Sequence, residues 1–362
     1  MAKVWNVGVV GCGIGRSHIF EGYATQPDKF RTAAICDLDE ARLASVGDEF
    51  GVPVRTRSFD ELLAMPDIDI VDICTPPSLH VPQALAALAA GKQVICEKPL
   101  AGSLAEADRL IAAEAQSRGR VLPIFQYRFG DGLQKAKRIL DLGLAGKPYV
   151  ATVETAWSRK PAYYTVPWRG RWDTELGGVL VGHSIHLHDL MCYFMGPIAS
   201  VFGRVATRVN AIEVEDCAAA SLLMESGALV TLSATLGSQK EISRLRFCFE
   251  NVTFESSLAP YAPGDAPWEI IPASPEIGAR IDEALADWEF VPSRFHGLMQ
   301  AYHAALESGG PLPVTLTGAR RSLELITALY HSNETGQPVS LPLGADHPKY
   351  HGWRPSTVQP AS

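Results

Sequence analysis

The sequence lacks the features that mark secreted, membrane-spanning or nucleic-acid-binding proteins. Its seven cysteines are scattered and form no C-x-x-C pair, which predicts a reducing, cytoplasmic compartment. No apolar run reaches the roughly 20 residues that cross a bilayer. The start, a single lysine before a strand-like run, does not resemble a secretory signal. No basic cluster stands out and the formal net charge is -8, so nucleic acid and anionic membranes are poor candidate partners.

What is present is the composition of an ordinary folded protein. Hydrophobic residues make up 47% of the chain and charged residues 20%, as in globular domains. A chain of 362 residues exceeds what one compact core usually holds, so we expect two domains. The proline-containing end at 355–362 predicts a loosely held tail.

Short apolar runs alternate with helical patterns in the first third of the chain. The predicted strands are 4–10, 33–36, 70–74, 94–96 and 121–125, and the helices between them are 39–50, 81–90 and 104–117. This alternation predicts βαβ units and a parallel sheet that is buried on both faces. We therefore predict an α/β fold that begins with a doubly wound Rossmann domain over residues 1–125.

From about Pro148 the pattern changes to strands linked by turns. The predicted strands are 150–157, 201–209, 217–223, 229–236, 244–249 and 252–255, with helices at 182–194, 295–308 and 319–335. This order predicts an α+β domain with a large, mostly antiparallel open sheet over residues 126–345, before a tail at 346–362. The last helices can pack back on the first domain.

The stretch GCGIGRSH follows the first predicted strand and opens a helix. Gly11 permits a tight turn and Gly13 lets the backbone approach a pyrophosphate, while the helix N-terminus supplies N–H groups. The third glycine of G-x-G-x-x-G falls at Arg16, so a plain glycine bend is an equal alternative on these residues alone. Arg16 can contact phosphate or lie in solvent. The turn residues predicted to bind a dinucleotide are Gly11, Gly13, Ile14, Gly15 and Arg16.

Two later strand ends support the dinucleotide interpretation. Asp37 ends the second strand, where a carboxylate bonds the ribose hydroxyls, and no arginine follows at once for a 2′-phosphate. The sequence therefore favours NAD over NADP, with helix capping as the alternative role for this acidic stretch. Thr75-Pro76 turns sharply at the end of the third long strand, in a loop that borders the ligand crevice of such sheets. His80 either faces the cofactor or starts the next helix.

The segment CEKP at 96–99 is the most specific stretch. Glu97 and Lys98 follow a buried strand at its carboxyl end and precede a proline. A lysine in that setting has few purely structural explanations, and a surface salt bridge is the weaker alternative. Thr75, Pro76, His80, Glu97 and Lys98 complete the predicted cofactor contacts.

Three histidines and an acid lie within GHSIHLHDL. At helical spacing His183 and His186 share a face, whereas His188 points elsewhere and is expected in solvent. Zinc binding is an alternative, but the spacing is not the i, i+4 pair of helical zinc motifs, and we predict no metal. Asp189 either contacts substrate or bonds a neighbouring element.

Taken together, these motifs resemble the Gfo/Idh/MocA oxidoreductase family over nearly the whole chain. The resemblance rests on GVVGCGIGRSH, ICDLD, DICTPPSLH, CEKPLAGSLAEA, ELGGVLVGHSIHLHDLMCYFMGP, TGQPVSLPL and HPKYHGW. It implies an NAD(P)-binding Rossmann domain, a C-terminal domain with an open sheet, and hydride transfer on sugars or polyols. It also implies a homodimer or homotetramer that associates through that sheet.

The resemblance gives Lys98 and His186 as the catalytic residues. Lys98 matches the family lysine that contacts the nicotinamide region and a substrate hydroxyl, and His186 matches the catalytic histidine, with Asp189 as its downstream acid. The family usually has an aspartate four residues before that histidine, where this chain has Gly182. His183 can substitute for it, since positions three apart share a helix face.

We hypothesise that the protein oxidises a secondary hydroxyl of a sugar, sugar derivative or cyclitol with NAD. One of Lys98 and His186 takes the hydroxyl proton and the other polarises the oxygen. Aromatic rings and guanidinium groups suit a polyhydroxylated ring. The candidate substrate contacts are Gln126, Arg128, Trp168, Arg169, His183 and Asp189. Two alternatives stay open: a glycoside-processing enzyme that oxidises the ring transiently, and a non-catalytic sugar sensor or co-repressor that binds NAD(P).

Overall fold

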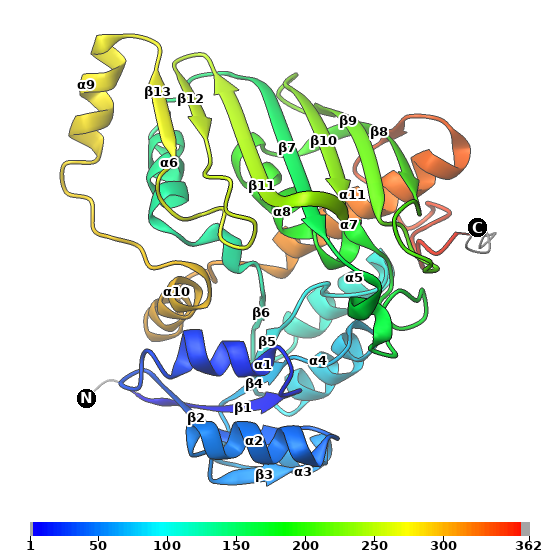
Figure 1. The fold of residues 1–362 in the computed structure, drawn as a ribbon. Coiled ribbons are helices and arrows are strands. Elements are labelled where there is room, and N and C mark those ends of the chain that lie inside the picture. Colours follow the sequence, from blue (N-terminus) through cyan, green and yellow to red (C-terminus); the bar gives the residue numbers. More distant parts are fainter. Residues whose placement is uncertain (1–2, 356–362) are drawn as a thin grey trace. The chain divides into compact units, whose positions relative to one another are not determined.

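The computed structural model describes residues 3–355, which form two compact units with one sheet each (Figure 1). Unit 1 is the chain up to Gly102 together with Glu106–Gln126 and Phe295–Arg320. Unit 2 is Ser103–Ala105, Tyr127–Arg294 and the described chain from Arg321 onward. Residues 356–362 of the predicted tail lie outside the described chain.

Unit 1 contains a six-stranded parallel sheet in the order β3-β2-β1-β4-β5-β6. The strands are β1 (Trp5–Val10), β2 (Phe30–Cys36), β3 (Val54–Thr56), β4 (Ile70–Ile73), β5 (Gln93–Cys96) and β6 (Val121–Pro123). All four residues of β4 are buried, as expected for a strand with helices over both faces. The strand order reverses direction between β1 and β4, which confirms the predicted doubly wound Rossmann sheet.

One helix from late in the chain packs within unit 1. The helical segments here are α1 (Gly15–Ser17), the π-helix η1 (His18–Tyr23), α2 (Glu40–Phe50), α3 (Phe59–Leu63), η2 (Pro77–Leu79), α4 (His80–Ala89), α5 (Leu104–Glu114) and α10 (Arg294–Ser308). The short η3 (Gln126–Arg128) begins in unit 1, and its residues Tyr127 and Arg128 belong to unit 2. The Phe295 ring of α10 lies 4.4 Å from the His18 ring, and a Cβ on Gly22 would lie 3.2 Å from Met299. The predicted range 126–345 thus contains a helix that the structure groups with unit 1.

Unit 2 contains an eight-stranded sheet in the order β13-β12-β11-β7-β10-β9-β8-β14. The strands are β7 (Pro148–Ser158), β8 (Ile198–Ala206), β9 (Cys217–Met224), β10 (Leu229–Thr235), β11 (Gly237–Phe249), β12 (Val252–Glu255), β13 (Glu269–Pro272) and β14 (Val339–Ser340). β7 and β10 pair in parallel and the other pairs are antiparallel. The predicted large, mostly antiparallel sheet is therefore confirmed.

One face of this sheet is covered by a helix, and the other carries exposed apolar residues. The helical segments of unit 2 are α6 (Asp131–Asp141), η4 (Pro161–Thr165), α7 (Val179–Gly182), α8 (Ile185–Met195), α9 (Pro275–Ala284) and α11 (Leu316–Thr335). α8 packs on β7 and β11, where Val153 and Phe247 are buried. On the opposite face Val150, Leu229 and Leu223 are exposed and are direct register neighbours across β7, β10 and β9.

Several elements were missed by the sequence pattern, among them the helices α6 and α9, which have eleven and ten residues. β3, β13 and β14 have two to four residues, too few to show the alternation that predicts a strand. Pairing with a neighbouring strand decides their conformation instead. Among residues 3–355, no helix combines the length and the apolar character that crossing a membrane requires.

Candidate active site

Three loops of unit 1 meet at the carboxyl edge of its sheet. The Cys74 N–H donates to the Val10 carbonyl at 2.7 Å, and the Glu97 N–H donates to the Ile73 carbonyl at 2.9 Å. These bonds continue the ladders past the ends of β1, β4 and β5. The glycine turn, the Thr75 loop and the Lys98 loop therefore lie along one edge, as parallel strands require.

The glycine turn combines close packing with open space. Gly11 has φ +95°, and a Cβ there would lie 2.5 Å from the Cys74 carbonyl oxygen. Gly15 packs against β1, because its Cβ would lie 2.7 Å from Val9 Cγ1. Apart from Gly13 and its two chain neighbours, no atom of residues 3–355 lies within 4 Å of the Cβ position of Gly13. Gly15 thus allows the close helix–strand contact expected of the third glycine, and Gly13 leaves room for a ligand.

The two residues that flank Gly15 are at the surface. Ile14 is the N-cap of α1 and is 44% exposed. Arg16 donates from Nε to Glu49 Oε2 at 2.7 Å and from Nη2 to Glu49 Oε1 at 2.5 Å. The structure therefore places the Arg16 side chain in an exposed ion pair with α2.

Asp37 is held beside the turn by backbone N–H groups. Its Oδ2 accepts from the Cys12 N–H at 2.8 Å, and its Oδ1 accepts from the Asp39 N–H at 2.9 Å. Arg42, on the first turn of α2, lies 3.2 Å from Asp37 Oδ2. The sequence interpretation did not single out Arg42, which follows Asp37 by five positions. The alternative capping role holds for Asp39, whose side chain accepts from the Arg42 N–H.

His80 joins the Thr75 loop to the Lys98 loop. The ring is buried, with Nδ1 2.7 Å from the Pro99 carbonyl oxygen and Nε2 2.8 Å from the Thr75 carbonyl oxygen. Burial lowers the pKa of His80. Thr75 Oγ1 donates to Gln83 Oε1 at 2.6 Å, just before Pro76 starts the turn into η2. Both ring nitrogens of His80 thus contact the protein backbone.

The Lys98 loop begins with a buried carboxylate. Glu97 Oε2 accepts from the Lys98 N–H at 2.9 Å, while Glu97 Oε1 lies 3.0 Å from His18 Nε2. Lys98 itself is partly exposed at the carboxyl edge. The loop therefore presents a lysine side chain at the same edge as the glycine turn.

In unit 2 the predicted histidine helix is broken into α7 and α8. His183 is the C-cap of α7, and its Nε2 lies 3.3 Å from the Tyr163 hydroxyl. His186, on α8, stacks on the Tyr127 ring with centroids 4.3 Å apart. His188 is fully buried, so its expected position in solvent is wrong. Burial lowers the pKa of His188 to about 3, because α8 is buried on nearly all sides.

Tyr163, Trp168 and Arg169 form an aromatic and cationic cluster with His183. The Arg169 guanidinium lies over the Trp168 ring at 4.2 Å and the Tyr163 ring at 4.0 Å, and it donates to the Tyr163 hydroxyl. Arg169 Nη1 also lies 3.4 Å from Glu175 Oε1. The cluster presents ring faces and hydrogen-bond donors together, which suits a polyhydroxylated ligand.

Glu175 was missed by sequence reasoning. It is buried, and its Oε1 lies 3.7 Å from the position that a Cβ on Gly182 would take. A carboxylate therefore lies next to the position where the family resemblance implies an aspartate. The available signal was an acid two residues before the Gly177-Gly178 pair.

Other predicted substrate residues bond to one another. Arg128 donates from Nε and Nη2 to the two Asp189 oxygens, each at 2.6 Å, and both side chains are largely buried. This bidentate pair matches the structural alternative stated for Asp189. Gln126 is buried in unit 1, and within the described chain its Oε1 has no hydrogen-bond partner.

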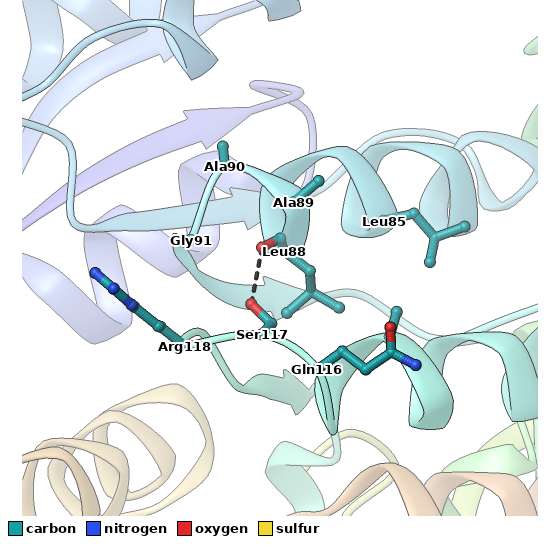
Figure 2. A pocket seen from close by; sticks show the side chains of 9 residues that line it. Leu85, Leu88, Ala89, Ala90, Gly91, Gln116, Ser117 and Arg118 are labelled. Carbon is teal, nitrogen blue, oxygen red and sulfur yellow. Dashed lines mark hydrogen bonds between the residues drawn. The ribbon is translucent and has the colours of Figure 1, made fainter.

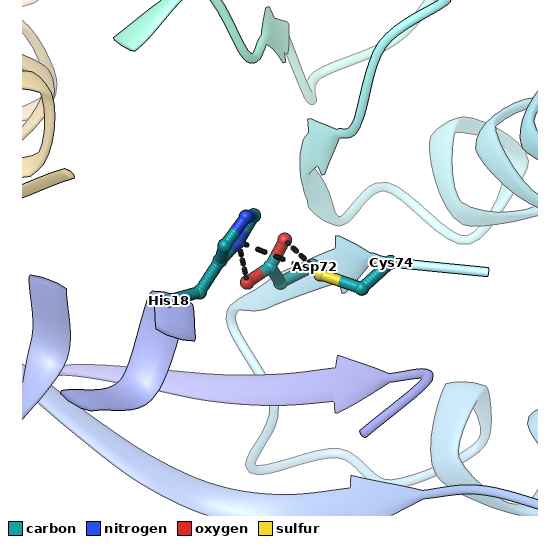
Figure 3. A group of neighbouring side chains, drawn as sticks. All are labelled: His18, Asp72 and Cys74. Atoms are coloured by element: carbon teal, nitrogen blue, oxygen red, sulfur yellow. Dashed lines mark hydrogen bonds and ion pairs between the residues drawn. The ribbon is translucent and has the colours of Figure 1, made fainter. Parts of the chain in front are cut away.

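A buried group behind the glycine turn has the spacing of metal ligands. His18 Nδ1, Asp72 and Cys74 Sγ lie within 4.8 Å of one another (Figure 3). These atoms already hydrogen-bond to each other, at 2.9 Å between His18 and Asp72 and 3.4 Å between Cys74 and Asp72. Burial also raises the pKa of the Cys74 thiol, and metals bind the thiolate. We therefore describe the group as a hydrogen-bonded network.

A separate hollow lies at the opposite edge of the same sheet (Figure 2). It is lined by the end of α4, including Leu85 and Leu88, and by residues 113–118. Two of its lining residues are joined by a hydrogen bond, in which Ser117 Oγ donates to the Leu88 carbonyl at 2.8 Å. Gly91 precedes β5, so the hollow is at the amino ends of the strands, away from the Lys98 loop.

Comparisons with known proteins define the class. Residues 5–125 match the oxidoreductase family with an NAD-binding Rossmann fold, and residues 133–255 match the GFO/IDH/MocA C-terminal domain. The chain belongs to the Gfo/Idh/MocA oxidoreductase family, which confirms the resemblance. The residues of this chain fit NAD: Gly13 leaves open space just before α1, and Asp37 directly follows β2.

Individual relatives are moderately similar. The uncharacterized oxidoreductase YrbE of Bacillus subtilis is 30% identical, over 64% of this chain and 67% of the relative. Myo-inositol 2-dehydrogenase of Thermotoga maritima is 31% identical, over 62% and 66% respectively. The crystal structure of the WlbA dehydrogenase from Bordetella pertussis, in complex with NADH and UDP-GlcNAcA, has a TM-score of 0.83 at 26% identity. The match covers 95% of this chain and 99% of that chain.

Proposed function

We propose that the protein is an NAD-dependent dehydrogenase that oxidises a secondary hydroxyl of a sugar, sugar derivative or cyclitol. The observation that carries this proposal is the Lys98 loop, which presents an amine at the same sheet edge as the glycine turn. The names of the relatives, among them an inositol dehydrogenase, support a polyol or sugar substrate. NAD, when bound, supplies the hydride acceptor.

Lys98 and His186 are the proposed proton-transfer groups. An alcohol loses a proton as its hydride leaves, so the reaction requires a positioned base. His186 has a suitable side chain, and its ring orientation is restricted by stacking on Tyr127. Lys98 is partly exposed, and the backbone on both of its sides is held by Glu97 and His80.

The proposed sugar contacts are the Tyr163, Trp168, Arg169 and His183 cluster. Ring faces there can stack on the C–H surface of a sugar, and the Arg169 guanidinium can donate to its hydroxyls. Because Arg128 and Asp189 satisfy each other, we assign them to holding η3 against α8 within unit 2.

The first experiment is a screen for NAD reduction with aldoses, sugar acids, cyclitols, anhydrosugars and glycosides. The Lys98→Met variant is then assayed on the substrate that the screen identifies. We expect turnover to fall about a thousandfold, because the positioned proton-transfer group is lost. NADH binding, measured by fluorescence, should stay within about threefold, as expected for a group that acts in the chemical step. Lys240→Met, at an exposed lysine, is the matched control. Unchanged turnover in Lys98→Met would contradict the assignment.

The same screen separates the two alternative functions. Release of an aglycone without net NADH would favour a glycoside-processing enzyme. NADH binding with no reaction on any carbohydrate would favour a sensor.

We also propose a homodimer or homotetramer that forms through the exposed face of the unit 2 sheet, supported by the apolar row Val150, Leu229 and Leu223. A cytoplasmic location is proposed as well, supported by seven cysteines that are all unpaired.

A further inference from the structure

A buried charge network in unit 1 has no role in the chemistry proposed so far. His18 is the first residue of η1, in the helical segment that the glycine turn opens. It is fully buried between Asp72, on β4, and Glu97, which follows β5. Figure 3 shows the His18 ring directed toward Asp72 and Cys74, and the Phe295 ring packs against it at 4.4 Å.

The geometry defines the charge of His18. Its Nδ1 lies 2.9 Å from Asp72 Oδ2 and its Nε2 lies 3.0 Å from Glu97 Oε1. Both ring nitrogens face a carboxylate oxygen, so when Asp72 and Glu97 are both ionised each nitrogen donates a proton and the ring is an imidazolium. Burial is the largest single influence and lowers the pKa of His18, but Asp72 and Cys74 together raise it well above the ordinary value.

The network continues to the main chain of Lys98. The second oxygen of Glu97, Oε2, accepts from the Lys98 N–H at 2.9 Å. The Glu97 carboxylate is therefore held on one side by His18 and holds the lysine backbone on the other. Charge-assisted hydrogen bonds are short and directional, so they restrict the rotation of the Glu97 side chain.

We propose that His18 is a positioning residue for Lys98, acting through the Glu97 carboxylate. It joins the segment opened by the glycine turn to the loop that carries the lysine, so that both move as one rigid piece of unit 1. The expected effect of His18 on catalysis rests on the proposed function of Lys98. The mechanical link to the Lys98 backbone is independent of any reaction.

The test compares His18→Asn with His18→Gln. The Asn amide nitrogen reaches about as far as Nδ1 and can keep the bond to Asp72, whereas it cannot reach Glu97. The Gln amide nitrogen reaches about as far as Nε2 and can keep the bond to Glu97. The measured quantity is hydrogen–deuterium exchange of the peptide that spans residues 97–102. We expect exchange at least about tenfold faster in the Asn variant and within about threefold of wild type in the Gln variant.

Tyr23→Phe is the matched control. The Tyr23 hydroxyl donates to Asp72 Oδ2 at 2.7 Å, at the far end of the network from Glu97. This variant should lose thermal stability while exchange in 97–102 stays unchanged. Equal exchange rates in His18→Asn, His18→Gln and Tyr23→Phe, whether fast or slow, would overturn the proposal. Such a result would mean that His18 contributes only to packing of the core.

Glu97→Leu provides a second route if His18→Asn does not fold. Leucine is of similar size but offers no acceptor, so the Lys98 N–H loses its partner and the same acceleration in 97–102 is expected. Normal exchange in Glu97→Leu would contradict the proposal. With a substrate in hand, His18→Asn should lower kcat more than it raises KM. Failure to find a substrate would count against the proposed function and leave the exchange result intact.

Discussion

At the scale of single residues, Gly182 and Glu175 connect the sequence motif to the fold. Gly182 has no side chain, and the Glu175 carboxylate lies 3.7 Å from the position of its absent Cβ. We propose that Glu175 supplies the acidic group that the family resemblance places at position 182. The sequence motif shows the glycine at 182, whereas only the fold shows the carboxylate of residue 175 beside it.

Exchanging the two positions tests this interpretation. Glu175→Gln should lower turnover about a hundredfold, because a buried charged group is removed. Adding Gly182→Asp to that variant should restore part of the activity, since the new Cβ has only the residue 175 side chain nearby. Gly182→Asp alone should not help, because two buried carboxylates would then repel each other.

The measurement is kcat on the substrate found in the screen, with circular dichroism to confirm folding. Glu213→Gln is the control, at an exposed glutamate of unit 2. Full activity in Glu175→Gln, or no restoration by the second substitution, would show that Glu175 is not the replacement.

At the scale of elements, the start of α7 depends on a buried acid from another part of the chain. Glu215 Oε1 accepts from the N–H groups of Gly178 and Leu180, each at 3.0 Å. Gly178 is the N-cap and has no side chain of its own to do this. The carboxylate thus satisfies helix-start donors that would otherwise be buried and unbonded.

Glu215 predicts a pH dependence of stability. Burial raises its pKa from 4.5 to about 7 in the folded protein. The folded state therefore takes up a proton that the unfolded state binds less tightly, and the resulting stabilisation is complete below pH 4.5 and is lost as pH rises through about 7. When the pH is lowered from 8 to 5, the free energy of unfolding of wild type should rise by about 3 kcal/mol relative to that of Glu215→Gln.

Urea unfolding of both proteins at pH 5, 6, 7 and 8 would measure this difference. The control is Glu225→Gln, at an exposed glutamate. Its free energy of unfolding should change with pH in the same way as that of wild type. A constant gap between wild type and Glu215→Gln at all four values would show that Glu215 keeps one charge state throughout.

Element types were predictable where hydrophobic periodicity is long, and less so where tertiary contacts decide. β1, β4, β5 and the hairpin of β11 and β12 follow the apolar pattern closely. β11 begins at Gly237 and not at Arg244, because pairing with β7 extends it through a polar, partly exposed stretch. The break between α7 and α8 was not predicted, since it depends on the turn at His183-Ser184.

The position of the candidate site residues was predictable to the same extent. Asp37 and Lys98 follow strands whose ends are readable in the sequence, and parallel strands align such residues at one edge of the sheet. Arg42, Glu175 and the link from His18 to Glu97 were not found, because each joins segments that only the fold brings together.

At the scale of the whole molecule, the uncovered face of the unit 2 sheet predicts association. Leu229 is 57% exposed and lies between Val150 and Leu223 in register. Wild type should therefore sediment at a multiple of 39.1 kDa, and Leu229→Glu should shift it toward that mass. Leu142→Glu, at the exposed end of α6, is the control. Wild type that sediments at 39.1 kDa would rule out this interface.

The late position of α10 has a consequence for the order of synthesis. Phe295 covers His18 and Met299 lies against Gly22, yet both are made long after the strands of unit 1 have left the ribosome. During synthesis the His18 network therefore lacks its packing partner Phe295 until residues 127–294 of unit 2 have been translated. A gene fragment that stops at residue 125 would therefore encode an incomplete core, and only nearly full-length translation supplies the helix that closes it.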